Sequence, residues 1–317
     1  MDQRAQSTWT LSDTRAMDLD RPCVVCIVNV TPDSFADGGV YNTVGGAVDR
    51  VRRALDDGAD MIDLGGESTR PGAGRVDAGE QIRRVVPVIE EIRKAGLGTG
   101  GKMGGGGVPI SIDTTVAAVA EASLDAGADV INDVSAMTED EAMVGLAVER
   151  GCGVVLMHRL RSPERDLYSD GYVEEPVYKE GVVEVVGDFL GSRRDVLESA
   201  GVGGDRIVLD PGLGFGKSVA DTLRLIRGTG GVGGIWGLGC PVMSGLSRKS
   251  FVGRVVLGRD SEPGERVDGT VGMSVAHLWC GARVFRVHDV AEHRRALDGA
   301  WAVMGCDGRE IGGVDWE

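Results

Sequence analysis

The sequence predicts an α/β fold, a (β/α)8 TIM barrel, because short apolar segments alternate regularly with helical segments along most of its 317 residues. The apolar segments have the length and composition of buried parallel strands. They lie at about residues 23–30, 61–65, 109–113, 129–134, 153–157, 206–210, 241–246 and 282–287. Nearly every segment ends on a carboxylate, an amide, a lysine or an arginine. Such residues at strand ends are typical of a site built on the carboxyl ends of barrel strands.

The segments between the predicted strands have the periodicity of surface helices. Between the first and second strands, one helical face carries Ala47, Val48, Val51, Ala54 and Leu55. Between the second and third, it carries Ile82, Val85, Val86, Ile89 and Ile92. Glycines suited to left-handed helix C-caps mark the joints from helix to strand, at Gly58, Gly127, Gly151, Gly201 and Gly281.

A doubly wound sheet is the alternative fold, but it would gather its ligand groups at one switch point, whereas here they follow almost every strand. We therefore expect a single barrel domain over residues 22–298. An N-terminal extension (1–21) precedes it and a C-terminal tail (299–317) follows it. The Gly-rich residues 96–107 are predicted to be a flexible surface insertion. They lie just before the third strand, so we place them at the end of the barrel that faces away from the site.

Composition excludes several classes of function. A formal net charge of -15 argues against nucleic acid or anionic membrane as a partner. No apolar run approaches the roughly 20 residues of a membrane span, and the polar N-terminal segment is unlike a targeting peptide. Six scattered cysteines do not form a disulfide framework and favour the cytoplasm. Cys23 and Cys26 form a C-x-x-C within an apolar run, and we predict that they are small buried hydrophobic residues.

Three glycine-rich patterns, at residues 96–102, 212–218 and 228–233, suggest nucleotide binding at first sight. Phosphate-binding loops need a strand before the glycines and a helix after them, so that backbone N–H groups converge on the phosphate. The first pattern has no preceding strand and the third leads into a strand. The second is one residue short and has Pro211 at the first glycine position. A P-loop NTPase is therefore disfavoured.

Several motifs in one order carry a family resemblance. They are Asn29–Phe35 with Asp37–Gly39, Asp63–Ala73, Ser111–Asp113, Ile131–Asp133, Leu209–Lys217, Ser247–Phe251 and Arg286–Val290. Over about residues 22–298 the chain resembles the dihydropteroate synthases, a family of pterin-binding TIM barrels. The resemblance implies an enzyme, usually a homodimer, that joins 6-hydroxymethyl-7,8-dihydropterin diphosphate to 4-aminobenzoate and releases pyrophosphate with Mg2+.

The same resemblance implies roles for residues at the strand ends. The pterin is expected to be held by Asp113, Asn132, Asp210 and Lys249, with Met157 and Phe215 beside its ring. A pterin is flat and has an edge of amide and amine groups, which buried carboxylate and amide side chains can pair. The diphosphate is expected on Asn29, Arg286 and His288, with Asn29 as the magnesium ligand and Asp37 as its outer-sphere partner. Lys249, Arg286, His288 and Asp37 are thus the candidate catalytic residues.

Aminobenzoate is expected on Thr69, Arg70 and Pro71 of the second loop and on Ser247, at the start of the helix after the seventh strand. Gly65, Gly66 and Gly72 indicate that this loop can open and close. Family members are thought to react dissociatively, which requires no covalent nucleophile.

The sequence departs from the family after the fifth strand, where Arg159 and Arg161 replace a methionine and a glycine. The two arginines could reach the diphosphate or face solvent, and we expect them to face solvent. Two alternatives remain. One is a non-catalytic paralogue that binds a pterin. The other is a methyltetrahydrofolate:corrinoid-protein methyltransferase, which would not need Ser247 and Lys249 together with Arg286 and His288 for a diphosphate.

Overall fold

The computed structural model describes residues 8–31, 43–98, 106–169, 171–172, 174–230 and 234–305. Three features expected from the sequence fall outside these ranges: Asp37, the middle of the Gly-rich insertion and the end of the C-terminal tail.

Eight parallel strands close into a barrel, which confirms the predicted fold. They are β3 (Cys23–Asn29), β4 (Met61–Gly65), β5 (Ile110–Asp113), β6 (Val130–Asp133), β7 (Gly153–Met157), β8 (Ile207–Asp210), β9 (Met243–Ser244) and β10 (Val284–Val287). Their order is β8-β7-β6-β5-β4-β3-β10-β9, and a parallel bridge between Leu209 and Val242 joins the two outer strands. β9 is shorter than the predicted segment 241–246.

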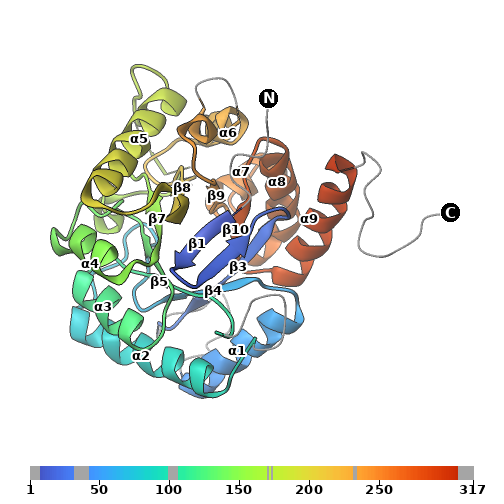
Figure 1. The fold of residues 1–317 in the computed structure, drawn as a ribbon. Coiled ribbons are helices and arrows are strands. Elements are labelled where there is room, and N and C mark those ends of the chain that lie inside the picture. Colours follow the sequence, from blue (N-terminus) through green and yellow to red (C-terminus); the bar gives the residue numbers. More distant parts are fainter. Residues whose placement is uncertain are drawn as a thin grey trace.

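Helices surround the strands (Figure 1). They are α1 (Val44–Asp56), α2 (Ala78–Lys94), α3 (Ala117–Asp125), α4 (Ala142–Arg150), α5 (Val182–Ala200), α6 (Val219–Gly228), α7 (Ser250–Leu257), α8 (Val267–Trp279) and α9 (Val290–Met304). The glycines predicted at the helix-to-strand joints all have positive φ, between 55° at Gly151 and 113° at Gly201. The last helix continues to Met304, beyond residue 298, where the sequence predicted the end of the barrel.

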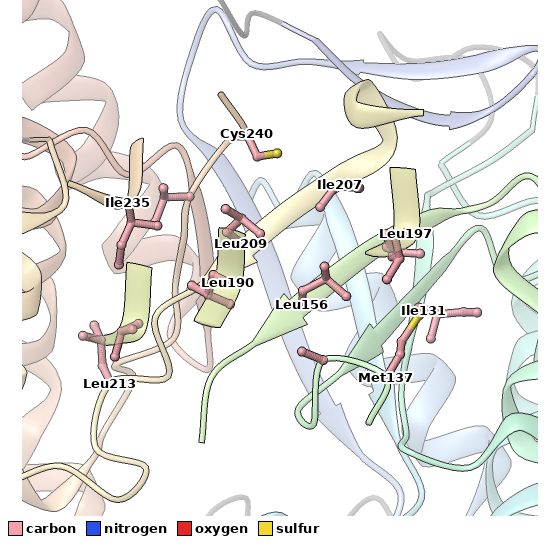
Figure 2. Close-up of a cluster of buried hydrophobic side chains, with 14 of the residues drawn as sticks. Ile131, Met137, Leu156, Leu190, Leu197, Ile207, Leu209, Leu213, Ile235 and Cys240 are labelled. Carbon is pink, nitrogen blue, oxygen red and sulfur yellow. The ribbon is translucent and has the colours of Figure 1, made fainter. Parts of the chain in front are cut away.

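Alternate strand residues face opposite sides of the barrel wall. One set packs against the helices; Figure 2 shows part of this layer, where Leu156 of β7 and Leu209 of β8 lie near Leu190 and Leu197 of α5. The other set fills the interior. At the amino ends of the strands this interior is apolar, with side chains including Val25, Met61, Val130, Val155, Val208, Met243 and Val284. Cys23 belongs to this cluster and Cys26 to the outer layer, both as buried thiols, as predicted.

A β-hairpin covers this apolar end of the barrel, a feature that the sequence analysis missed. β1 (Thr8–Ser12) pairs antiparallel with β2 (Arg15–Asp18), and Figure 1 shows the hairpin across the centre of the ring of helices. Trp9 and Leu11 are fully buried in the interior cluster. Arg15 also donates to the carbonyl of Gly107. The described end of the Gly-rich insertion therefore lies at this end of the barrel, as predicted.

Candidate functional site

The carboxyl ends of the strands surround a polar cavity of about 200 Å³. Most of the side chains predicted to bind substrate line this single cavity. They are Asn29, Thr69, Arg70, Pro71, Asn132, Met157, Asp210, Phe215, Ser247, Lys249, Arg286 and His288. Asp113 lines a smaller cavity of about 20 Å³, which shares Ser68, Thr69 and Val134 with the large one. The tertiary structure thus brings together residues from strands that are far apart in the sequence.

Arg286 lines the cavity and joins two buried carboxylates. Its Nε donates to Asp63 Oδ2 at 2.6 Å, and its Nη2 donates to Asp113 Oδ2 at 2.7 Å. Asn132 Nδ2 also donates to Asp63, at 3.3 Å to Oδ1. Burial lowers the pKa of Arg286, but the two carboxylates outweigh this effect and raise it. The sequence led us to expect Arg286 at the diphosphate; in the structure its guanidinium joins the carboxylates of Asp63 and Asp113.

Asp63 is a site residue that the sequence analysis did not select, although it begins one of the motifs. It is 1% exposed and lies two positions before the end of β4, on the face that points into the barrel. Its register with Ile27 on β3 and Ser111 on β5 places it one layer below the rim. The alternation of strand residues was the signal that could have identified it.

One carboxylate oxygen of Asp113 accepts no hydrogen bond from the described residues. Its Oδ1 is buried and has no hydrogen-bond partner among the described residues. Burial raises the pKa of Asp113 to about 7, against the opposing effect of Arg286. An unpaired buried acceptor is costly unless a ligand supplies a donor. An amine or ring N–H at the edge of a pterin is a donor of this kind.

Asp210 forms another part of the cavity wall. Its Oδ1 accepts a 2.7 Å hydrogen bond from the backbone N–H of Gly212, which orients the carboxylate. Burial raises its pKa, and Lys249 counters this shift. A Cβ at Gly245 would lie 2.9 Å from Asp210 Oδ2, so this glycine is needed for the close approach of the β9 loop.

Lys249 and Phe215 form a cation–aromatic pair beside these carboxylates. The Lys249 ammonium lies 4.0 Å from the centre of the Phe215 ring and donates to the carbonyl of Leu213. Burial lowers the pKa of Lys249 to about 7, although Asp210 opposes this shift. The pair therefore provides a flat aromatic surface next to a cation that can lose its proton near neutral pH.

Lys217 lies near the end of the glycine-rich segment that resembled a phosphate-binding loop, and its amine has a structural role. Its Nζ is fully buried and donates to the carbonyls of Gly212 and Phe215, each at 2.9 Å, and it lies 2.9 Å from His158 Nδ1. Burial lowers the pKa of Lys217 to about 7 and that of His158 to about 2. The amine thus holds the loop that carries Phe215 and does not face a ligand.

Ser247 and His288 connect the last two loops of the barrel. Ser247 Oγ accepts from the backbone N–H of His288 at 3.1 Å and lies 3.0 Å from the ring Nδ1. Burial, with Arg248 and Arg286, lowers the pKa of His288 to about 3, so the imidazole is neutral at pH 7. The hydroxyl and Nδ1 share one hydrogen bond, whose direction depends on the tautomer of the ring. At neutral pH His288 is therefore an uncharged imidazole and not a cation.

Arg248, between Ser247 and Lys249, fixes this arrangement. Its backbone has a φ of 56°, and its side chain forms a two-point ion pair with Asp289, at 2.9 and 2.5 Å. We had expected Ser247 at the start of the helix after the seventh strand. α7 begins at Ser250, so Ser247 instead precedes the helix. The left-handed residue turns Ser247 and Lys249 toward the same cavity.

The second loop, residues 66–77, is docked against its neighbours. The N–H of Gly72 donates to the carbonyl of Pro163 at 2.8 Å, and Glu67 Oε1 accepts from the N–H of Val76 at 2.9 Å. Gly66 is required for packing, because a Cβ there would lie 3.1 to 3.2 Å from Val85 and Gln81 of α2.

The expectation for Arg159 was wrong. Its side chain is 7% exposed and forms an ion pair with Glu139, because the loop after β6 lies directly above it. Arg161 is exposed, as expected. The cavity also contains Tyr168, Ser169, Pro263 and Arg266, which the sequence analysis missed; no pattern in the sequence distinguishes these loop residues.

The described residues contain no group of three or more His, Cys, Asp or Glu side chains that could hold a metal ion. Asn29 lines the cavity and offers one amide oxygen, a donor type that magnesium accepts. In the same part of the chain, no helix has the length and apolar character needed to span a membrane.

A polar cavity with buried carboxylates at the carboxyl end of a TIM barrel is the site of a pterin-binding enzyme, and the family described as "Pterin binding enzyme" matches residues 25–288. The dihydropteroate synthase of Streptococcus pyogenes serotype M6 is 42% identical over 267 residues, 84% of this chain and 90% of that protein. A probable bifunctional folylpolyglutamate synthase/dihydropteroate synthase of Haloferax volcanii is 41% identical over 89% of this chain, which spans 31% of that longer protein.

Solved structures agree. A Xanthomonas albilineans dihydropteroate synthase with 4-aminobenzoic acid has a TM-score of 0.80 at 39% identity, covering 95% of this chain and 99% of that chain. The same enzyme with 7,8-dihydropteroate has a TM-score of 0.76 at 37% identity, and the match covers 92% of this chain and 97% of that chain. The chain belongs to the dihydropteroate synthase family of transferases.

Proposed function

We propose that the protein condenses 6-hydroxymethyl-7,8-dihydropterin diphosphate with 4-aminobenzoate to give 7,8-dihydropteroate and pyrophosphate in folate biosynthesis. The observation that carries this proposal is the buried Oδ1 of Asp113, which has no partner among the described residues; Asp113 is in register with Asn132 on the next strand, and Asp210 is buried at the end of β8. These groups match the donors and acceptors along one edge of a pterin. Phe215 supplies an aromatic surface for the ring.

The rim of the same cavity has the chemistry for the other two groups. His288, Asn29 and Arg286 line this part of the cavity and would contact a diphosphate there. Thr69, Arg70, Pro71 and Ser247 line the same cavity, with Ser247 in contact with His288, and an aminobenzoate carboxylate would find hydroxyl and guanidinium donors there. The relative with bound 4-aminobenzoic acid supports aminobenzoate as the second substrate.

The reaction needs preorganised charge more than a reactive side chain. In a dissociative route the bond from the exocyclic methylene to the diphosphate breaks first, and the dihydropterin ring delocalises the positive charge. Asp113 and Asp210 stabilise this charge, while Arg286 and His288 stabilise the departing diphosphate. The amine of the bound aminobenzoate then attacks the methylene, the new C–N bond takes the place of the broken C–O bond, and the amine loses one proton to solvent.

Mg2+ fits the donor set, and Asn29 would hold it through the amide oxygen; Asp37, the expected outer-sphere partner, lies outside the described residues. When bound, the ion would neutralise charge on the diphosphate.

The test is to incubate the purified protein with both substrates and Mg2+, and to follow pyrophosphate release and dihydropteroate formation. Asp210→Ala serves as the matched variant, because loss of a charged hydrogen bond costs about 1.5–3 kcal/mol and should lower pterin affinity at least about tenfold. Pterin binding without product would favour the non-catalytic paralogue. Methyl transfer from methyltetrahydrofolate to a corrinoid protein would favour the other alternative.

We also propose that the protein is a cytoplasmic homodimer. Exposed apolar side chains on α7, at Val255, Val256 and Leu257, support an interface between copies. Light scattering of the purified protein tests the dimer, and charged substitutions at Val255 and Leu257 should produce monomers.

A further inference from the structure

Four charged residues from three different loops form a continuous ion network beside the site. Arg75, at the end of the second loop, pairs with Glu139 of the loop after β6 and, at 2.6 Å, with Glu164 of the loop after β7. Arg159, also after β7, pairs with the same Glu139. Arg75 Nη1 further donates to Thr115 Oγ1, after β5, at 3.2 Å. We call Arg75, Glu139, Arg159 and Glu164 the latch.

The latch is only one layer of residues away from the main cavity. Arg75, Arg159 and Glu164 line the smaller cavity, and its other wall includes Ser68 and Thr69. Ser68 and Thr69 also line the main cavity. A displacement of the latch would therefore move the side chains that form the rim of the site.

The two carboxylates of the latch are ionised beside its two arginines. Burial raises the pKa of Glu139, but the neighbouring Arg75 and Arg159 outweigh this effect and lower it. Hydrogen bonds from Ser162 and Arg75 lower the pKa of Glu164 to about 2. Both carboxylates are thus ionised at neutral pH. Arg159 is the least exposed member, so its pair with Glu139 is the least screened by salt.

We propose that the latch holds the second loop against the cavity, and that Arg75 and Arg159 are positioning residues for the second substrate. The inference rests on the proposed function, because Thr69, Arg70 and Pro71 on this loop are the assigned aminobenzoate contacts. It extends that function: with arginine at position 159, this chain gains a charged link from the β7 loop to Glu139 of the β6 loop, which in turn pairs with Arg75 of the second loop. Holding the loop in place removes part of the ordering cost that aminobenzoate would otherwise bear.

The test compares the wild-type protein with Arg159→Met, which restores the residue type of the family motif and keeps the apolar volume. The KM for aminobenzoate should rise about fivefold, the effect of losing ~1 kcal/mol. The KM for the pterin diphosphate and kcat should each stay within about twofold, because neither depends on the second loop to the same extent. Arg159→Lys should restore part of the aminobenzoate affinity. High salt should raise the wild-type KM for aminobenzoate toward that of Arg159→Met.

Arg150→Met is the matched control. Arg150 pairs with Asp125 and Glu121 on the outer helices, so its loss removes a comparable charge without touching a loop of the site. An equal rise in both KM values, or the same change in Arg150→Met, would overturn the proposal.

Hydrogen exchange provides a readout that does not depend on activity. Amides of residues 66–77 should exchange faster in Arg159→Met than in the wild type, while the amides of β4 and α2 remain protected. Unchanged exchange in this loop would overturn the latch, and faster exchange with an unchanged aminobenzoate KM would overturn its role in positioning. If the wild-type protein makes no dihydropteroate, the proposed function fails, and the exchange comparison still decides whether the latch holds the loop.

Discussion

Arg286 on β10 and Asp63 on β4 are 223 positions apart in the sequence, and their side chains form a 2.6 Å ion pair inside the barrel. Asp63 is almost fully buried, so its charge depends on this partner and on the amide of Asn132. The pair lies between the apolar base of the barrel and the substrate cavity. It therefore connects the stability of the fold to the geometry of the site.

Replacing Asp63 by asparagine should destabilise the protein strongly. The change leaves the Arg286 guanidinium with one buried carboxylate instead of two, and breaking a buried pair in this way costs roughly 3–5 kcal/mol. Urea unfolding followed by circular dichroism measures the loss. Asp49→Asn, which removes the exposed pair with Arg52, should change the free energy of unfolding by less than about 0.5 kcal/mol. Similar values for the two variants would show that the buried pair adds little.

The buried Lys217 should make stability depend on pH above neutrality. Its pKa is lowered to about 7 in the folded protein, whereas an unfolded lysine has a pKa of about 10.4. Between these values the unfolded chain binds the proton and the folded protein does not, so stability rises with pH. Relative to Lys217→Met, the wild-type free energy of unfolding should rise by up to about 1.4 kcal/mol per pH unit from pH 7 to about 8.5. Parallel curves for the two proteins would mean that Lys217 keeps its proton.

Replacement of His288 should weaken binding of the diphosphate group and leave binding of the pterin ring almost unchanged. His288→Ala removes a neutral N–H donor, and the loss of one hydrogen bond to a charged group predicts about tenfold weaker binding of the pterin diphosphate. Binding of the plain hydroxymethyl-pterin should change by less than about twofold, as measured by calorimetry. His288→Gln keeps a donor on a side chain of similar length and should recover most of the affinity. Equal losses for both ligands would indicate a purely structural histidine.

The contact between Ser247 and His288 should couple aminobenzoate binding to pyrophosphate. Ordering the loops of the site costs roughly 1–2 kcal/mol for each residue fixed, more than aminobenzoate alone can supply. We expect weak or undetectable aminobenzoate binding to the free protein, and measurable binding once pyrophosphate with Mg2+ is present. The coupling must be reciprocal, so aminobenzoate should strengthen pyrophosphate binding by the same factor.

His288→Ala should abolish this coupling in both titrations, because it removes the ring that shares a hydrogen bond with Ser247. Tight aminobenzoate binding in the absence of pyrophosphate would contradict the idea of an incomplete site.

The order of the motifs predicted the barrel and most of the cavity because each motif ends a strand. In a closed parallel barrel all these ends meet on one face, so residues from Asn29 to His288 had to converge once the strands were identified. The hairpin at the other end was missed. Trp9 and Leu11 alternate with polar residues over too short a segment to distinguish a strand from a polar terminus.

By itself, the sequence determined which side chains stand at the strand ends and hence what chemistry the site has, because composition and spacing are local properties. Only the tertiary structure decided how these side chains are paired. Arg286 lies between Asp63 and Asp113, and Arg159 pairs with Glu139 instead of facing solvent. Pairing depends on distances of a few ångströms between segments that are remote along the chain, and strand periodicity does not encode those distances. Burial also shifts the pKa values of Lys249, His288 and Asp113, because desolvation is a property of the packed fold.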